Sequence, residues 1–345
     1  MDYTVLPNTD IKVSKICLGT MTWGNQNTQK DGFSQMDFAT DQGVNFFDTA
    51  ELYPVPATKE TQGRTSRIIG NWLKKRGTRD KIIIASKIAG PGDYTAHIRK
   101  TGFRGNSIQE AIDMELKRLK TDYIDLYQLH WPERQTNTFG IRDFNPNYND
   151  PWTDNFYEVI YELNRLIKVG KIRTYGISNE KAWGCMRYIE EVRKNKLHKI
   201  STIQNPYSLL NRVFEGDLAE ISYRENIGLL AYSPLGFGVL SGKYINGTAS
   251  KNTRLNLFPR FSRYSSQQAT NATKSYFELS KEIGISLTTL ALSFVNSRPF
   301  ICSNIIGATT IDQLKENIES IRTKLSKEVI QRINEIHSAI PNPSP

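Results

Sequence analysis

Strand-like and helical segments alternate along almost the whole chain, and this alternation restricts the possible folds more than any other feature. Short apolar runs typical of buried strands lie near residues 15–18, 44–48, 82–87, 123–130, 173–178, 200–205, 228–232 and 303–306. A helical period follows each run, near 33–42, 64–76, 108–119, 154–169, 182–195, 213–226, 267–283 and 312–320. Such alternation predicts a parallel sheet with crossover helices. Eight repeats predict an α/β fold with a single (β/α)8 TIM barrel.

The segments outside these eight units predict additions to the barrel. Residues 3–13 have the pattern of an N-terminal β-hairpin, which could close the bottom of the barrel. Two extra helices are expected near 287–296 and 326–339. Ser107, with Glu110 three residues later, has the pattern of a capping box and predicts the start of the third helix.

Two long loops interrupt the alternation. The first, 131–152, follows the fourth strand, and the second, 233–266, follows the seventh. Loops of this length in a compact domain are usually functional or disordered. Because both follow strands, they are expected at the same end of the barrel. No linker divides the chain, so residues 1–345 are predicted to form one barrel domain that carries both loops.

Composition and charge exclude several classes of function. The chain has 345 residues and a formal net charge of +10, which is compatible with nucleic-acid binding. However, its basic residues are scattered and do not alternate with aromatic ones, so we expect no nucleic-acid partner. No apolar run approaches the ~20 residues that span a bilayer, so no membrane association is expected.

The cysteines, the histidines and the N-terminal residues predict a cytoplasmic protein without a metal centre. Residues 1–4 contain neither the basic region nor the apolar core of a secretion signal. Cys17, Cys185 and Cys302 are far apart, without metal or redox spacing, and are expected to be reduced thiols. The four histidines also lack the spacing of metal ligands.

Polar residues stand where several strand-like runs end. The run before Asp48 stops at that carboxylate, and Tyr53 follows five residues later. The next two runs end at Lys87 and His130. Because α/β enzymes carry their chemistry at the carboxyl ends of parallel strands, these four side chains are expected to meet in one site.

This set of side chains points to reduction of a carbonyl group. A phenol has an ordinary pKa near 10, and a neighbouring ammonium lowers it by stabilising the phenolate. A carboxylate paired with the ammonium would keep it charged and in place. Tyr53 is therefore a candidate general acid beside Lys87 and Asp48, with His130 orienting a carbonyl oxygen that accepts hydride.

Each member also has a structural interpretation. Asp48 could cap a helix or form a structural ion pair, and Tyr53 could be one surface tyrosine among 16. Lys87 could extend along apolar surface toward solvent, and His130 could lie at the barrel rim. The four together are far more specific than any one of them.

The ordered motifs of the chain resemble those of the aldo-keto reductases, most closely their Tas-type branch. The resemblance runs from Tyr3 to about Pro343 and implies a (β/α)8 barrel with Asp48, Tyr53, Lys87 and His130 as the catalytic tetrad. The motifs lie at 19–24 (GTMTWG), 48–56 (DTAELYPVP), 86–87 (SK), 122–132 (DYIDLYQLHWP), 176–179 (GISN), 204–212 (QNPYSLLNR) and 307–310 (GATT).

The resemblance also implies NADP(H) as cofactor. In the family, Tyr232 would stack on the nicotinamide and the segment after it would wrap the pyrophosphate. Lys243 and Arg254 would add positive charge near the phosphates, which favours NADPH over NADH. The residues implied in binding the cofactor are Thr20, Met21, Ser178, Asn179, Gln204, Tyr232, Ser233, Pro234, Leu235, Gly236, Phe237, Gly238, Lys243, Arg254, Gly307, Thr309, Gln313, Glu316 and Asn317.

The residues themselves allow further statements about the cofactor segments. The glycines at 236, 238 and 242 superficially resemble a Rossmann motif, but a polar loop follows them where that motif requires a helix. Residues 307–309 lead into a helix whose N-terminal amides could bind a phosphate. Without the family match, Gln313 and Asn317 could equally be ordinary exposed helix residues.

Two alternatives to a carbonyl reductase stay open on the residues. The first is a largely non-catalytic, cofactor-binding scaffold similar to potassium-channel β-subunits, which carry Asn at the position of His130. The second is a lyase or isomerase that uses Lys87 as a Schiff base. The residues leave the physiological substrate and the oligomeric state open. Aromatic pocket walls that admit many small-molecule carbonyl substrates are expected from the 131–152 loop and from Trp23, Tyr94, Trp131, Trp152 and Tyr207.

Overall fold

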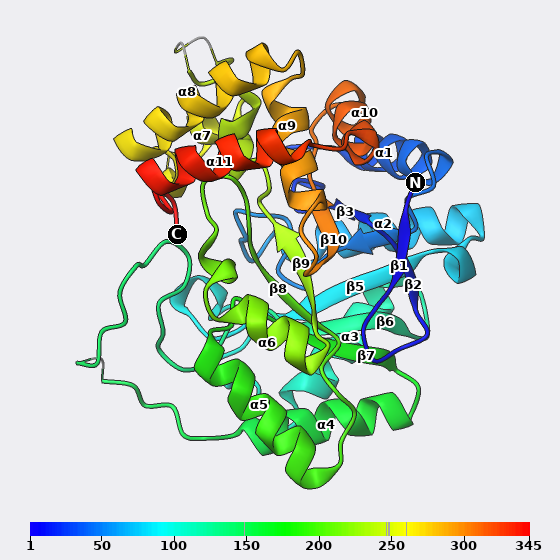
Figure 1. The fold of residues 1–345 in the computed structure, drawn as a ribbon. Helices are drawn as coiled ribbons and strands as arrows, with labels where there is room; N and C mark the ends of the chain where they lie inside the picture. Colours follow the sequence, from blue (N-terminus) through cyan, green and yellow to red (C-terminus); the bar gives the residue numbers. More distant parts are fainter. Residues whose placement is uncertain (148, 246, 248, 260) are drawn as a thin grey trace.

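The computed structural model describes residues 1–345 except 148, 246, 248 and 260. Eight parallel strands close into a barrel in the order β10-β3-β4-β5-β6-β7-β8-β9 (Figure 1). The predicted (β/α)8 barrel is therefore confirmed. The barrel strands are β3 (Ile16–Gly19), β4 (Phe46–Asp48), β5 (Ile83–Ile88), β6 (Ile124–Leu129), β7 (Ile172–Ser178), β8 (Thr202–Pro206), β9 (Gly228–Tyr232) and β10 (Ile301–Ile306).

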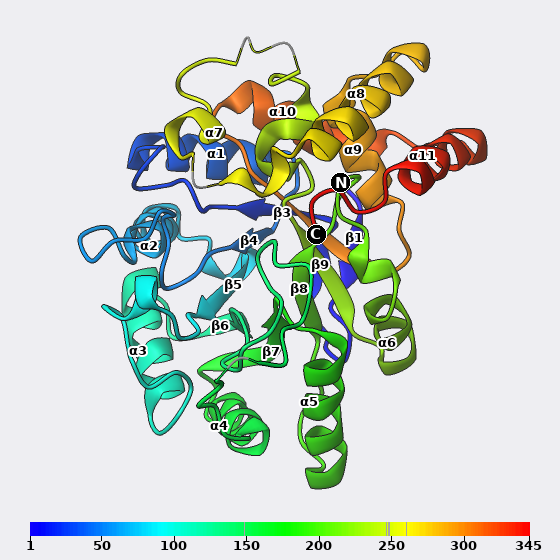
Figure 2. The ribbon, with the colours of Figure 1, turned by 90° about the vertical axis from the view of Figure 1, so that its left-hand side faces the viewer.

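Helices surround the barrel and cover the outer faces of its strands, as the view along the barrel shows (Figure 2). They pack through apolar stripes on the strands, as expected for a parallel sheet that is buried on both faces. The principal helices are α1 (Gln29–Asp41), α2 (Arg64–Arg76), α3 (Ser107–Leu119), α4 (Phe156–Lys168), α5 (Ala182–Asn195), α6 (Leu218–Glu225), α8 (Gln267–Glu282) and α10 (Ile311–Glu319), with the two expected extra helices α9 (Leu287–Asn296) and α11 (Lys327–Ala339).

The N-terminal hairpin closes one end of the barrel, as predicted. Its strands β1 (Tyr3–Val5) and β2 (Lys12–Ser14) pair antiparallel. Leu6, Ile11 and Val13 are buried against the side chains that fill the barrel interior. The barrel strands end at the opposite side, and this carboxyl-terminal end stays open. The interior side chains are Cys17, Phe46, Ala85, Leu126, Leu230, Cys302 and Ile305.

Local hydrogen bonds account for the differences from the predicted helix boundaries. The capping box predicted at Ser107 and Glu110 is wrong, because Asn106 is the N-cap of α3 and the Ser107 hydroxyl bonds to Thr101 at 2.7 Å. A capping box does form at Thr28 and Asp31, and it starts α1 four residues before the predicted position. The sixth helical segment divides into a short 3-10 turn at 213–215 and α6.

The two long loops lie at the open end of the barrel (Figure 2). The described residues of the 131–152 loop form no helix or strand. The 233–266 loop contains a 3-10 segment, η4 (Gly236–Ser241), and the short helix α7 (Arg254–Leu257). Among the helices formed by the described residues, none is long and apolar enough to cross a membrane.

Candidate active site

Asp48 and Lys87 form a buried ion pair at the open end of the barrel. They stand at the ends of the adjacent parallel strands β4 and β5, whose register pairs Asp48 with Ala85. Lys87 Nζ lies 2.6 Å from Asp48 Oδ2 and donates to the Thr49 carbonyl at 2.7 Å. Gln204 Nε2 donates to the other carboxylate oxygen at 2.8 Å. Both oxygens of Asp48 are thereby held in fixed positions.

Tyr53 and His130 lie directly above this pair. Lys87 Nζ is 4.9 Å from the centroid of the Tyr53 ring, and the rings of Tyr53 and His130 meet edge-to-face at 5.8 Å. Backbone bonds fix both segments, because Glu51 N–H donates to the Lys87 carbonyl and His130 N–H to the Ile88 carbonyl. The structure therefore brings together the four residues of the predicted tetrad, whose catalytic roles stay a prediction.

Burial keeps both proton-carrying rings uncharged at neutral pH. The pKa of Tyr53 is raised well above its usual value by burial and then by the Asp48 carboxylate, which Arg254 partly offsets. This direction is opposite to the expectation that Lys87 would lower the pKa, because burial and the Asp48 carboxylate both favour the protonated phenol. Burial, aided by the charge of Lys87, lowers the pKa of His130 well below its ordinary value. A protonated phenol and a neutral imidazole can both donate hydrogen bonds.

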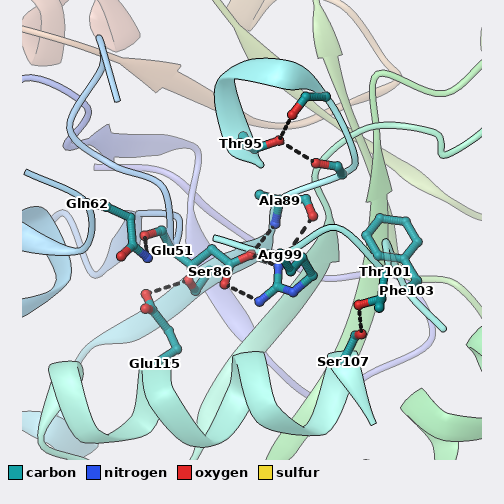
Figure 3. A network of polar contacts seen from close by, with 12 residues as sticks. Glu51, Gln62, Ser86, Ala89, Thr95, Arg99, Thr101, Phe103, Ser107 and Glu115 are labelled. Carbon is teal, nitrogen blue, oxygen red and sulfur yellow. Dashed lines mark hydrogen bonds and ion pairs between the residues drawn. The ribbon is translucent and has the colours of Figure 1, made fainter. Parts of the chain in front are cut away.

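A second buried carboxylate, which sequence reasoning missed, ties the Tyr53 segment to the segment after β5 (Figure 3). Both terminal nitrogens of Arg99 donate to the Glu51 carboxylate, Nη1 to Oε1 and Nη2 to Oε2, the latter at 2.8 Å. The Ala89 N–H also donates to Oε1, at 2.5 Å. Gln62 Nε2 donates to the Glu51 carbonyl at 2.9 Å. These bonds fix the chain between Asp48 and Tyr53. A second carboxylate within the motif that begins at Asp48 was the sequence signal.

A cavity of about 1000 Å³ opens above these residues. Asp48, Tyr53 and His130 line it, whereas Lys87 lies beneath them. An ammonium that is buried and bonded to Asp48 is not available to attack a carbonyl, which argues against a Schiff base. The predicted cofactor residues that line the cavity are Thr20, Met21, Asn179, Gln204, Tyr232, Ser233, Pro234, Leu235, Phe237, Gly238, Lys243, Arg254, Gly307, Thr309, Gln313, Glu316 and Asn317.

The two remaining predicted cofactor residues, Ser178 and Gly236, lie behind the cavity wall. Ser178 donates to the Gln204 carbonyl at 2.7 Å and is bonded to Asn179, so it supports residues that do line the cavity. Asn179 accepts from the Tyr232 hydroxyl at 2.6 Å and donates to the His130 carbonyl at 2.8 Å. This chain of bonds connects the end of β9 with the end of β6.

The segment after β9 suits the phosphates of a dinucleotide. Phe237 and Gly238 have positive φ angles within η4, so this segment is a tight turn and does not begin a helix. A Cβ on Gly238 would lie 2.8 Å from Lys243 Cε, so the glycine allows this cation to approach the backbone. Lys243 and Arg254 line the cavity, and of the described residues no carboxylate forms an ion pair with either.

The turn before α10 forms the other end of the cavity. Thr310 caps the helix by accepting from the Gln313 N–H, and Thr309 donates to the Gln313 side chain. Glu316 accepts from Ser286 at 2.6 Å, and Asn317 donates to the Gly307 carbonyl at 3.1 Å. The 131–152 loop contributes Phe139 and Gly140 to the lining, as expected. Sequence reasoning did not single out the following lining residues: Gln26, Asn252, Ser262, Arg263, Ser286 and Thr288.

Only part of the predicted aromatic wall faces the cavity. Tyr94 and Trp131 line it, and their rings stack at 5.6 Å. Three predicted wall residues were wrong. Trp23 is buried and donates to Gln35, Trp152 packs edge-on against Phe156 of α4, and Tyr207 is buried with its hydroxyl on Glu215.

No group of three or more His, Cys, Asp or Glu side chains among the described residues is arranged to hold a metal ion. The three cysteines are free and buried. Burial raises the pKa of the Cys17 and Cys302 thiols, so both are poor nucleophiles inside the barrel.

Comparison with known proteins agrees with this geometry. Residues 15–338 match the model of the aldo/keto reductase family. The chain belongs to this family. It is 46% identical to Protein tas of Escherichia coli, with full coverage of both chains. It is 32% identical to the uncharacterized oxidoreductase YrpG of Bacillus subtilis, over 97% of this chain and 96% of the relative.

A more distant relative has a name that states its substrate. The chain is 28% identical to norsolorinic acid reductase A of Aspergillus parasiticus, over 95% of this chain and 79% of the relative. Membership of the family identifies the protein as an oxidoreductase, and aldo/keto reductases generally use NAD(P)H. The likeness to Protein tas agrees with the Tas-type branch expected from the motifs.

Proposed function

We propose that this protein is an NADPH-dependent reductase that converts aldehydes or ketones to alcohols, with Tyr53 as the general acid. The observation that carries the proposal is the position of Tyr53 and His130 over the buried Asp48–Lys87 pair, at the base of the cavity. Bound NADPH would supply the hydride. The protein must then hold the carbonyl group and provide a proton to its oxygen.

The residues divide these tasks according to their charge and position. Tyr53 keeps its proton at neutral pH because burial raises the pKa of the phenol, so it enters the reaction as a proton donor. His130 is neutral because burial lowers its pKa, and it can donate a hydrogen bond to the same oxygen. Lys87, held by Asp48, places a positive charge beneath the Tyr53 ring that would stabilise the phenolate left after proton transfer.

The cavity lining supports NADPH as the cofactor. Asn179, Gln204 and Tyr232 would hold the nicotinamide end, next to Tyr53 and His130. Lys243 and Arg254 would meet phosphate groups, since a 2′-phosphate needs cations where an NAD site places an acid. Gln313 and Asn317, at the start of α10, would hold the adenosine end.

A spectrophotometric panel of aldehydes and ketones tests this function. Purified protein is mixed with NADPH and each carbonyl compound, and loss of NADPH absorbance is followed in the wild type and in Tyr53→Phe. We expect reduction by the wild type only, with similar NADPH affinity in both proteins. A wild type that binds NADPH but transfers no hydride to any reactive aldehyde would instead support the cofactor-binding scaffold.

A further inference from the structure

Among the described residues, three cationic side chains line the cavity, and the proposed cofactor accounts for two of them. Lys243 packs against the Gly238 turn, and Arg254 lies 5.7 Å from the centroid of the Phe237 ring in the same turn. Arg263 is the third. Of the described residues, no carboxylate forms an ion pair with it. A cation at a cavity wall without a neighbouring acid is a site that can receive an anion.

Arg263 lies where the two long loops meet. Its guanidinium carbon is 5.6 Å from the centroid of the Phe139 ring, in the 131–152 loop, and 6.0 Å from that of Tyr264. A Cβ on Gly140 would lie 3.4 Å from Arg263 Cγ and Nε. Burial opposes the positive charge, but the phenols of Tyr232 and Tyr264 outweigh this effect and raise the pKa of Arg263. The guanidinium is therefore charged and held in place by its neighbours.

A continuous row of rings connects Arg263 with the reacting end of the cavity. Phe139 meets Trp131 edge-to-face at 5.9 Å, and Trp131 lies 4.9 Å from the His130 ring. Phe139, Trp131 and His130 all line the cavity. These rings form an apolar part of the cavity wall beside Arg263, which favours a substrate with a flat, apolar body.

We propose that Arg263 binds an acidic group of the substrate, so that the preferred substrates are carbonyl compounds in which an aromatic or apolar body separates the carbonyl from a carboxylate. This inference rests on the proposed reductase function and names the substrate class of the same site. The planar guanidinium matches a carboxylate with two parallel hydrogen bonds.

Matched acid and ester substrates test this site. The substrates are 4-formylbenzoate and 4′-formylbiphenyl-4-carboxylate, each compared with its methyl ester. The proteins are the wild type, Arg263→Met, which keeps a long side chain without its charge, and Arg263→Lys, which keeps a charge without the planar fork. Arg322→Met is the matched control, because Arg322 is exposed and outside the cavity lining.

We expect the wild type and Arg322→Met to prefer at least one acid over its ester by roughly tenfold or more in kcat/KM. In Arg263→Met, KM for that acid should rise roughly 10- to 100-fold, the scale of one charge-assisted contact, while the ester changes by less than about twofold. Arg263→Lys should keep part of the preference. NADPH affinity and Tm should stay close to those of the wild type.

Three results would overturn the proposal. One is a wild type with equal kcat/KM for acid and ester at both lengths. Another is an equal loss for acid and ester in Arg263→Met, which would assign Arg263 to loop packing. The third is weaker NADPH binding with an unchanged ratio of acid to ester, which would assign it to the cofactor.

A binding measurement separates this proposal from the reductase function. Biphenyl-4,4′-dicarboxylate has no reducible carbonyl, so its affinity for the NADP⁺-bound protein can be measured by calorimetry without turnover. A wild type that reduces no aldehyde refutes the reductase function alone. Roughly tenfold weaker binding of the dicarboxylate to Arg263→Met would still support the Arg263 site, and equal binding would refute it.

Discussion

Replacing Lys87 with Met removes one partner of an ion pair that lies wholly inside the barrel. The Lys87 side chain has no exposed surface, and Asp48 is 3% exposed. The substitution would delete the 2.6 Å contact to Asp48 and the 2.7 Å bond to Thr49. The Gln204 amide would still donate a hydrogen bond to Asp48, but it carries no charge. Breaking a buried pair in this way costs about 3–5 kcal/mol of folding free energy, because an uncompensated charge is left behind.

The double variant Lys87→Met with Asp48→Asn separates stability from chemistry. It removes both charges, and the Asn oxygen can still accept the Gln204 bond, so most of the lost stability should return. Carbonyl reduction should stay low in both variants, because neither stabilises the phenolate of Tyr53. Urea unfolding gives the free energies, and single-turnover hydride transfer gives the activity. If the single variant were within about 1 kcal/mol of the wild type, or the double variant reduced aldehydes normally, the reasoning would be refuted.

Three further substitutions test the remaining parts of the site. Tyr53→Phe should lower kcat by roughly 10²–10⁴-fold with NADPH affinity preserved, and a variant that kept most of its kcat would show that another group donates the proton. Arg254→Ala should weaken NADPH binding roughly 10- to 100-fold and NADH binding much less in fluorescence titrations, whereas equal losses would contradict a 2′-phosphate contact. His130→Asn should lower kcat/KM for aldehydes roughly 10²–10³-fold. Burial lowers the pKa of His130, so below about pH 6.5 the imidazole gains a proton in the unfolded chain but not in the folded protein. Acid therefore favours unfolding of the wild type, and His130→Asn should lose less stability than the wild type between pH 7 and pH 5.

The sequence predicted those parts of the site that depend on strand geometry. A parallel barrel places every strand end at one rim, so polar residues that end apolar runs, such as Asp48 and Lys87, must converge. The fold followed from the same alternation, since eight strands with crossover helices have few other ways to bury both faces. In the fold, the errors concern helix starts, where one hydrogen bond decides the boundary, as at Thr28 and Ser107, and the division of the sixth helical segment.

Side chains on loops and on strand-to-helix turns could not be assigned to the site from the sequence. Trp23 and Trp152 have the aromatic character of pocket walls, but hydrogen bonds to Gln35 and Asn155 fix their indoles elsewhere. Arg263 shows the reverse case, because nothing in its local sequence marks a cavity residue. Its position depends on contact with Phe139, which is 124 positions away along the chain. Such contacts depend on how two irregular segments pack against each other. Irregular segments show no helical or strand periodicity in their sequence from which the packing could be predicted.

The charges around the open end explain why this arrangement suits carbonyl reduction. Asp48 and Lys87 compensate each other, so the base of the site adds little net charge near an uncharged carbonyl. In the proposed reaction, the neutral donors Tyr53 and His130 would face the carbonyl oxygen as it gains negative charge, and Lys87 would lie beneath the phenol that gives up its proton. The buried dipoles and the ammonium are already oriented before reaction, so little reorganisation is needed when charge develops. Burial, and after it the Asp48 carboxylate, raises the pKa of Tyr53 and so keeps the phenol protonated beforehand.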